Sequence, residues 1–392
     1  MRKTLFIAVI VCIAASSFIV LKRFPNNPVT HLKLLFTIGK GSWVSTTKEK
    51  DEQNPYYTKK HELEIYSPVL HIDTIYHSMA GPTSFYAVEL DKGAKPHLLW
   101  ITDYSIEVTN KRATEIMAKD FMCHNNLDFD VKPYFQSFHI DERVNGSNSR
   151  YATLTEGQAN IKLPEGFGIP IFSNDNMLIH TQALNHNIFP VSMDVRHCIT
   201  IGYVKDEELK KPLIPLYKRT VHISVPVDTT KHSLDESCAI GQDCVAAPAS
   251  HTFIRGGEDG KSYASHWLLK IGRDTFRSNV TEKMGLTANT TVHLINVHLH
   301  PYAETLSLRD ITANSIVYTS HVKSYTSKTG LDSIEYYSNP TGVMLYKDHQ
   351  YELVCITNNT SGKVQDMMAV MILYMRDSEL EANIAKMKNK GI

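Results

Sequence analysis

Short extended segments recur along this chain, and they limit its fold more than any other feature. Each alternates apolar and polar residues or is rich in β-branched residues, and each is bounded by Gly, Pro, Asn or Asp. Such segments predict β-strands, whereas helical periodicity is scarce. The clearest ones cover residues 97–110, 220–228, 291–300, 308–322 and 350–358. The pattern predicts an all-β protein built from sandwiches.

The chain has 392 residues, which is long enough for two domains, each with its own core. A charged, proline-containing stretch at 204–215 suggests where the boundary lies. We therefore expect an N-terminal sandwich over residues 31–210 and a C-terminal sandwich over residues 211–378. A charged tail, residues 379–392, completes the chain. The stretch 377–390 is a helical candidate, and we expect it to be a solvated appendage.

Residues 1–24 are predicted to be an export segment. An apolar run, residues 5–21, has basic residues on both sides. The run is short for a membrane span, and the small residues at 14–16 form a mediocre cleavage site, so a cleaved signal peptide and a retained membrane anchor both fit. Either alternative places the rest of the chain outside the cytosol, in the periplasm or secreted. The anchor would also attach it to a membrane.

The charge of the chain limits the kinds of partner it can bind, and its cysteine count bears on whether it forms disulfides. Lys and Arg number 41, as do Asp and Glu, and no basic stripe is present. The balance argues against nucleic acid as a partner. Of six cysteines, one lies in the apolar run, which leaves an odd number in an oxidising compartment. Cys238 and Cys244 stand close together in a loop-like segment, and we expect them to form a disulfide.

Two histidines one residue apart, His298 and His300, precede a methionine-rich strand at 364–375. In an extended segment alternate side chains share a face, so both imidazoles can reach one point. Imidazole suits copper, zinc and iron, whereas a thioether favours copper, particularly Cu(I). Each signal alone is weak, because methionine in an apolar strand usually packs a core. A methionine at the same point as the histidines would make a copper site.

Four segments in their order resemble a known enzyme family. They are DFMCHNNLDF, MLIHTQALNHN, TVHLINVHLHPYAE and QDMMAVMILYM. Together they resemble the copper type II, ascorbate-dependent monooxygenases, the family of peptidylglycine α-hydroxylating monooxygenase and dopamine β-monooxygenase, over roughly residues 70–376. The resemblance is closer still to uncharacterised bacterial members. It implies two jelly-roll-like β-sandwiches facing each other across a cleft, with one copper on each.

The resemblance implies ligands for both coppers. At the C-terminal site they are His298, His300 and Met368, the methionine two residues after Asp366. Met367, Ala369 and Met371 would then point to the opposite face and pack a core. The family implies that O2 is activated at this copper and that ascorbate is the external reductant.

At the N-terminal site, Cys123 and His124 stand where the family has two consecutive histidines. A thiolate there would bind Cu(I) tightly; alternatively Cys123 is disulfide-bonded or merely buried. The third ligand falls in MLIHTQALNHN, where His186 fits the family pattern better than His180. Two coppers per chain are therefore expected.

The positions that bind a peptide carboxylate in the family differ here. Asn296 replaces an arginine, and Val370 and Ile372 replace an asparagine and a tyrosine, so a peptide ending in glycine is a poor candidate substrate. We expect an exported copper monooxygenase that hydroxylates an aliphatic C–H of a small molecule with O2. The alternative is a non-catalytic copper store or chaperone on the same fold. A third alternative, an adhesion-type sandwich with chance histidines, explains the motif order least well.

Overall fold

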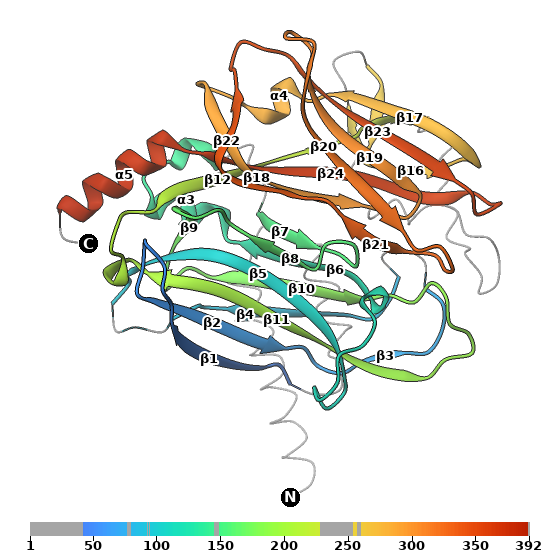
Figure 1. The fold of residues 1–392 in the computed structure, drawn as a ribbon, viewed down its shortest axis with the longest axis horizontal. Helices are drawn as coiled ribbons and strands as arrows, with labels where there is room; N and C mark the ends of the chain where they lie inside the picture. The colour runs from blue at the N-terminus through green and yellow to red at the C-terminus, as the bar shows by residue number, and fades with distance from the viewer. Residues whose placement is uncertain are drawn as a thin grey trace, which may run out of the picture.

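The computed structural model describes residues 42–76, 80–91, 93, 95–144, 149–227, 254–256 and 260–390. Almost all regular structure in these residues is β-strand, which confirms the predicted all-β sandwich fold. Two stacked halves are visible, the N-terminal half below and the C-terminal half above (Figure 1). The strands predicted at 97–110, 291–300, 308–322 and 350–358 are all present in whole or in part.

The N-terminal half is a sandwich of two sheets. One of them continues into a long sheet of twelve strands in the order β1-β2-β11-β5-β9-β12-β24-β18-β22, with β3, β8 and β16 attached at its sides; the other has the order β4-β10-β6-β7. The strands of this half are β1 (Val44–Asp51), β2 (Lys59–Tyr66), β3 (Leu70–Ile72), β4 (Thr83–Val88), β5 (Leu98–Asn110), β6 (Met122–Phe129), β7 (Arg150–Leu154), β8 (Asn160–Lys162), β9 (Phe167–Phe172), β10 (Met177–Ala183) and β11 (Met193–Lys205).

The C-terminal half packs the end of the long sheet against a five-stranded sheet, β17-β23-β19-β20-β21, and carries a small sheet, β13-β15-β14. Its strands are β12 (Ile214–His222), β13 (Val225–Val227), β14 (Ile254–Gly256), β15 (Ser262–Ala264), β16 (His266–Leu269), β17 (Gly272–Asn279), β18 (Thr290–Leu299), β19 (Ala303–Asp310), β20 (Ser315–Ser324), β21 (Leu331–Ile334), β22 (Tyr337–Leu345), β23 (Tyr351–Asn359) and β24 (Gln365–Arg376). The helical elements are η1 (Lys119–Phe121), α3 (Val131–Ser137), η2 (Asp141–Arg143), η3 (Asp206–Glu208), α4 (Thr281–Met284) and α5 (Ser378–Asn389).

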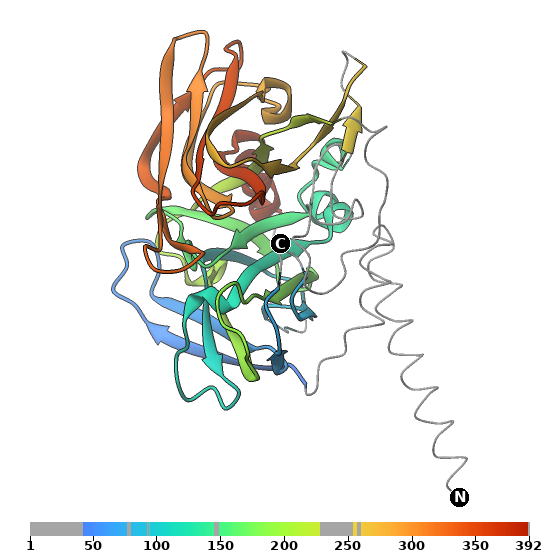
Figure 2. The same ribbon diagram turned by 90° about the vertical axis from the view of Figure 1, so that its right-hand side faces the viewer.

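Strand β24 contributes one face to each of two hydrophobic cores. Ile372 and Tyr374 belong to the core of the N-terminal half, whereas Met367, Ala369 and Met371 belong to the core of the C-terminal half. Alternation along a strand explains this division, because successive side chains point to opposite faces. The two sandwiches therefore pack directly on each other through β24. The turned view shows the two halves stacked in the same way (Figure 2).

Hydrogen bonds also cross between the halves. The backbone N–H of Ile334 donates to the Gly157 carbonyl at 2.7 Å, and that of Leu331 donates to the Glu156 carboxylate, also at 2.7 Å. Glu156 is buried, and the loss of solvation raises its pKa to about 8. These contacts hold β21 of the C-terminal half against the loop after β7.

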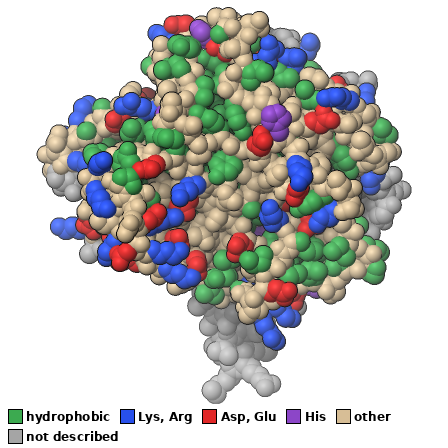
Figure 3. Space-filling model, in the orientation of Figure 1, with side chains coloured by type: hydrophobic (Ala, Val, Ile, Leu, Met, Phe, Trp, Pro, Cys, Tyr) green, Lys and Arg blue, Asp and Glu red, His purple; other side chains and the backbone are tan. Residues whose placement is uncertain are grey.

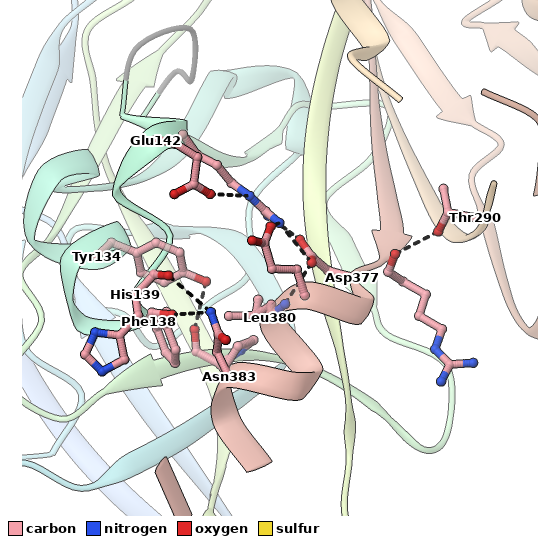
Figure 4. A network of polar contacts seen from close by, with 12 residues as sticks. Tyr134, Phe138, His139, Glu142, Thr290, Asp377, Leu380 and Asn383 are labelled. Carbon is pink, nitrogen blue, oxygen red and sulfur yellow. Dashed lines mark hydrogen bonds and ion pairs between the residues drawn. The ribbon is translucent and has the colours of Figure 1, made fainter. Parts of the chain in front are cut away.

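The C-terminal helix α5 is helical as predicted, but it is not a solvated appendage. Leu380 and Ile384, one turn apart, are 0% and 5% exposed and join the core of the N-terminal half. Arg143 pairs with Asp377 at the start of the helix, and the Asn383 amide donates to two backbone carbonyls at 3.1 Å (Figure 4). The partly buried Met387 packs against the same core. The apolar stripe of α5 therefore has only three residues among many charged ones, which is why the sequence suggested a solvated helix.

Several predictions fall outside the described residues: the export segment 1–24 and the disulfide between Cys238 and Cys244. Among the residues that are described, no helix is both long and apolar enough to cross a membrane. Positive and negative side chains are interspersed on the face seen in Figure 3.

Candidate metal centre

Three neighbouring strands bring the predicted C-terminal ligands together. In the order β16-β24-β18, His266 pairs with Met368, and the backbone N–H of His300, just past the end of β18, donates to the Met368 carbonyl at 3.3 Å. His298 lies two residues before His300 and pairs with Val370. Directly paired residues and alternate residues of a strand share a face. One face of the sheet therefore carries three imidazoles and one thioether.

The side chains of this group converge. Nε2 of His266 lies 2.7 Å from Sδ of Met368. The ring centroids of His266 and His300 are 5.5 Å apart, and those of His298 and His300 are 5.4 Å apart. Nδ1 of His300 lies 3.1 Å from a carboxylate oxygen of Asp366. A carboxylate in this position fixes the orientation and tautomer of a metal-binding imidazole.

The state of His298 suits a metal ligand. Its Nδ1 is buried and makes no hydrogen bond within the described residues. The pKa of His298 lies well below its usual value, first because of burial and then because His300 and His266 are close by. The imidazole is therefore neutral near pH 7, and neutral imidazole is the form that binds metals. A buried ring nitrogen with no hydrogen bond costs free energy that a metal ion would recover.

The donor set fits copper better than other metals. Imidazole nitrogens and a thioether sulfur are the ligands that Cu(I) accepts and that magnesium, calcium and manganese do not. Across the described part of the chain, no group of three or more His, Cys, Asp or Glu side chains is arranged so that it could hold a metal ion. A metal at this face would therefore need these side chains to move closer together and the sulfur of Met368 to act as a ligand.

The N-terminal group lies on strands β6 and β10. His124 pairs with Gln182, and the rings of His124 and His180 are 4.9 Å apart. The sulfur of Cys123 lies 3.4 Å from Nδ1 of His124. Consecutive strand residues normally point apart, but a β-bulge between Gln182 and Ala183 disturbs the pairing opposite Cys123. A bulge of this kind allows two adjacent residues to reach one site.

His180 lies beside His124 on the paired strands β10 and β6, whereas the preferred His186 lies beyond the end of β10. Strand β10 ends at Ala183, so the alternation that would have placed His186 on the same face stops three residues too early. His180 also accepts or donates a hydrogen bond with the Thr83 hydroxyl at 2.6 Å and stacks on Phe85.

The two histidine groups influence each other across the boundary between the sandwiches. The pKa of His124 lies well below its usual value, chiefly because it is buried. Repulsion from His180 and Arg150 adds to this, followed by repulsion from His298 and His300, which belong to the other half.

Two of the positions that bind a peptide carboxylate in the family are buried where the two halves meet. Asn296 is 0% exposed and Ile372 is 1% exposed. With its amide in the orientation that satisfies both ends, Asn296 donates to the Thr153 carbonyl at 3.1 Å and accepts from Gln158 at 3.0 Å. Strand β7 and the loop after it cover the face on which substrate was expected.

Comparison with known proteins leaves function open. No protein-family model matches the chain, and no curated protein matches it. Solved structures with some likeness include the STIV MCP, with 8% identity, 79% of this chain and 96% of that chain covered, and a TM-score of 0.26. Another is PNGF-II, with 7% identity, 90% and 68% covered, and a TM-score of 0.26. At these TM-scores neither likeness supports a functional argument.

Proposed function

We propose that this chain is an exported copper-binding protein whose centre at His298, His300 and Met368 serves a monooxygenase reaction on a small molecule. One observation supports the copper centre most: these donors share a face of the sheet, and the buried Nδ1 of His298 makes no hydrogen bond. The monooxygenase reaction rests on the resemblance in sequence. Copper at the two sites, reduced by ascorbate, would supply O2 activation and the oxidation of an aliphatic C–H.

The chain's own residues would prepare the centre. Burial keeps His298 neutral, Asp366 orients His300, and Met368 supplies a soft donor that favours the reduced metal. Cys123, His124 and His180 would hold the second copper on the N-terminal half. The absence of the family's arginine at Asn296 argues for a neutral or apolar substrate.

A second function, copper storage or transfer without catalysis, is favoured by a specific observation. Asn296 and Ile372, beside the His298 row, are fully buried under the N-terminal half. A substrate would need another path to the metal or a separation of the halves. The thiol of Cys123 suits a tight Cu(I) store, because thiolate is a soft ligand.

The test uses the mature exported protein reduced by ascorbate under anaerobic conditions. Metal analysis should give two copper ions per chain. Addition of O2 should reoxidise the metal, small neutral substrates should accelerate that reaction, and His298→Ala should abolish it. If the protein binds copper but turns over no substrate, the monooxygenase proposal is wrong and copper storage is the better explanation. A purified chain that retains no copper at all would overturn both.

A further inference from the structure

We propose that His266 is a third imidazole ligand of the metal at Met368, which makes the donor set three nitrogens and one sulfur. This inference rests on the proposed copper function and adds a residue that the sequence motifs do not contain. His266 precedes Trp267 in a short strand and has no second histidine at metal-ligand spacing. Sequence alone therefore gives it no role.

Strand pairing places His266 in line with two of the expected ligands. β16 and β18 lie on either side of β24, and His266 and His300 both stand opposite Met368. Neighbouring strands are about 4.8 Å apart, so three such side chains form a row across the sheet. The neighbouring Trp267 points to the opposite face, where it belongs to the core of the C-terminal half.

The contact between His266 and Met368 is short for two groups that interact weakly. Nε2 lies 2.7 Å from Sδ, although a thioether is only a weak hydrogen-bond acceptor. Around one tetrahedral metal, with bonds of about 2.05 Å to nitrogen and 2.3 Å to sulfur, these two atoms would be about 3.5 Å apart. Each side chain would therefore need to shift by only about 0.4 Å to bind an ion between them, a movement within the reach of a methionine side chain.

His266 also lies close to another imidazole of the group, that of His300, and is buried like it. His266 is 6% exposed and His300 is 8% exposed, and their ring centroids are 5.5 Å apart. His266 therefore lies beside a thioether and a second imidazole, both of which can bind a metal ion.

The donor count has a consequence for reactivity. Two imidazoles and a thioether would leave a fourth position open on a tetrahedral ion, whereas a third imidazole fills it. His266 as a third nitrogen donor would therefore favour retention of Cu(I) at this centre.

The experiment compares Cu(I) affinity, by competition with a chromophoric chelator, among the wild type, His266→Gln, Met368→Leu and the matched control His293→Gln. Loss of a neighbouring orienting residue typically weakens metal binding 10–100-fold, so loss of a true ligand should cost at least roughly tenfold. His293→Gln, another buried histidine, should leave the affinity unchanged. The apo forms are compared by circular dichroism.

A second measurement does not depend on any change at His266. X-ray absorption of the Cu(I)-loaded double variant Cys123→Ser, His124→Gln reports the Met368 centre alone, and three imidazoles per sulfur are expected. Two imidazoles per sulfur, or wild-type affinity in His266→Gln while Met368→Leu loses binding, would overturn the role of His266 and leave the copper proposal standing. Equal affinity in the wild type, Met368→Leu and His298→Ala would overturn the copper proposal itself.

Discussion

Replacing Met368 by leucine separates its proposed metal role from a packing role. Met368 is partly buried, and leucine has a similar volume, so the change should cost less than about 1.5 kcal/mol of unfolding free energy. The sulfur, however, is lost completely. We therefore expect Met368→Leu to fold normally and to lose Cu(I) at this site, with the copper content falling from two per chain to one.

The size of the effect follows from ligand linkage. Free Cu(I) at 100 times the dissociation constant stabilises the folded chain by about 2.7 kcal/mol. Each kcal/mol raises Tm by about 2–4 °C in a domain of 150–250 residues, so this site alone should contribute roughly 5–11 °C. Thermal unfolding with and without buffered Cu(I), under anaerobic conditions, measures the difference between wild type and variant. The N-terminal site is present in both proteins and cancels.

Met367→Leu is the matched control. Met367 is 0% exposed and packs in the core of the C-terminal half, on the face opposite Met368. The Met367→Leu substitution should lower the free energy of unfolding by a similar amount and leave the copper-dependent rise in Tm intact. The reasoning is refuted if Met367→Leu loses that rise and Met368→Leu keeps it, because the strand would then present the other face to the metal.

Three further predictions concern the second site, pH and the C-terminal helix. His180→Ala should remove one of the two copper ions per chain, whereas His186→Ala should remove none, as measured by metal analysis. Burial lowers the pKa of His197 to about 4, below the ordinary 6.5, so the unfolded chain binds a proton that the folded chain does not. Stability should therefore fall as pH drops from 6.5 towards 4, by about 3 kcal/mol, and His197→Gln should flatten that loss in urea unfolding. Leu380→Ala should cost about 2–5 kcal/mol because the side chain is fully buried, whereas the exposed Lys386→Ala should stay within about 0.5 kcal/mol; equal effects would mean that α5 is not docked in solution.

The fold followed from the sequence because strand periodicity is a local property. Alternation in β24 correctly separated Met368 from Met367, Ala369 and Met371, since a strand has only two faces. His186, which fits the family pattern better than His180, lies beyond Ala183, where β10 ends, so alternation along the strand does not determine which face it is on. Strand ends depend on turns and tertiary contacts, which local periodicity does not encode.

Periodicity predicts where strands form, but a single sequence does not show which strands pair with each other. His266 joins the centre only because β16 pairs with β24, 102 residues later in the chain. The burial of Asn296 likewise depends on β7 of the other half, and the docking of α5 depends on Arg143 and on the core beneath Leu380. Each of these features is a contact between distant segments, so no local pattern could have predicted it.

The choice between catalysis and storage depends on the interface between the halves. The face of β24 that carries Met368 continues into Ile372 and Tyr374, which are packed in the core of the N-terminal half. Tyr374 also donates a hydrogen bond to the Tyr151 carbonyl at 2.6 Å. Opening the halves would expose these side chains and break hydrogen bonds at Asn296 and Leu331, so it would cost several kcal/mol, at about 1.5–3 kcal/mol for each large apolar side chain. Met368 and His298 are only partly buried, so a metal ion could reach these two side chains from solvent without such an opening.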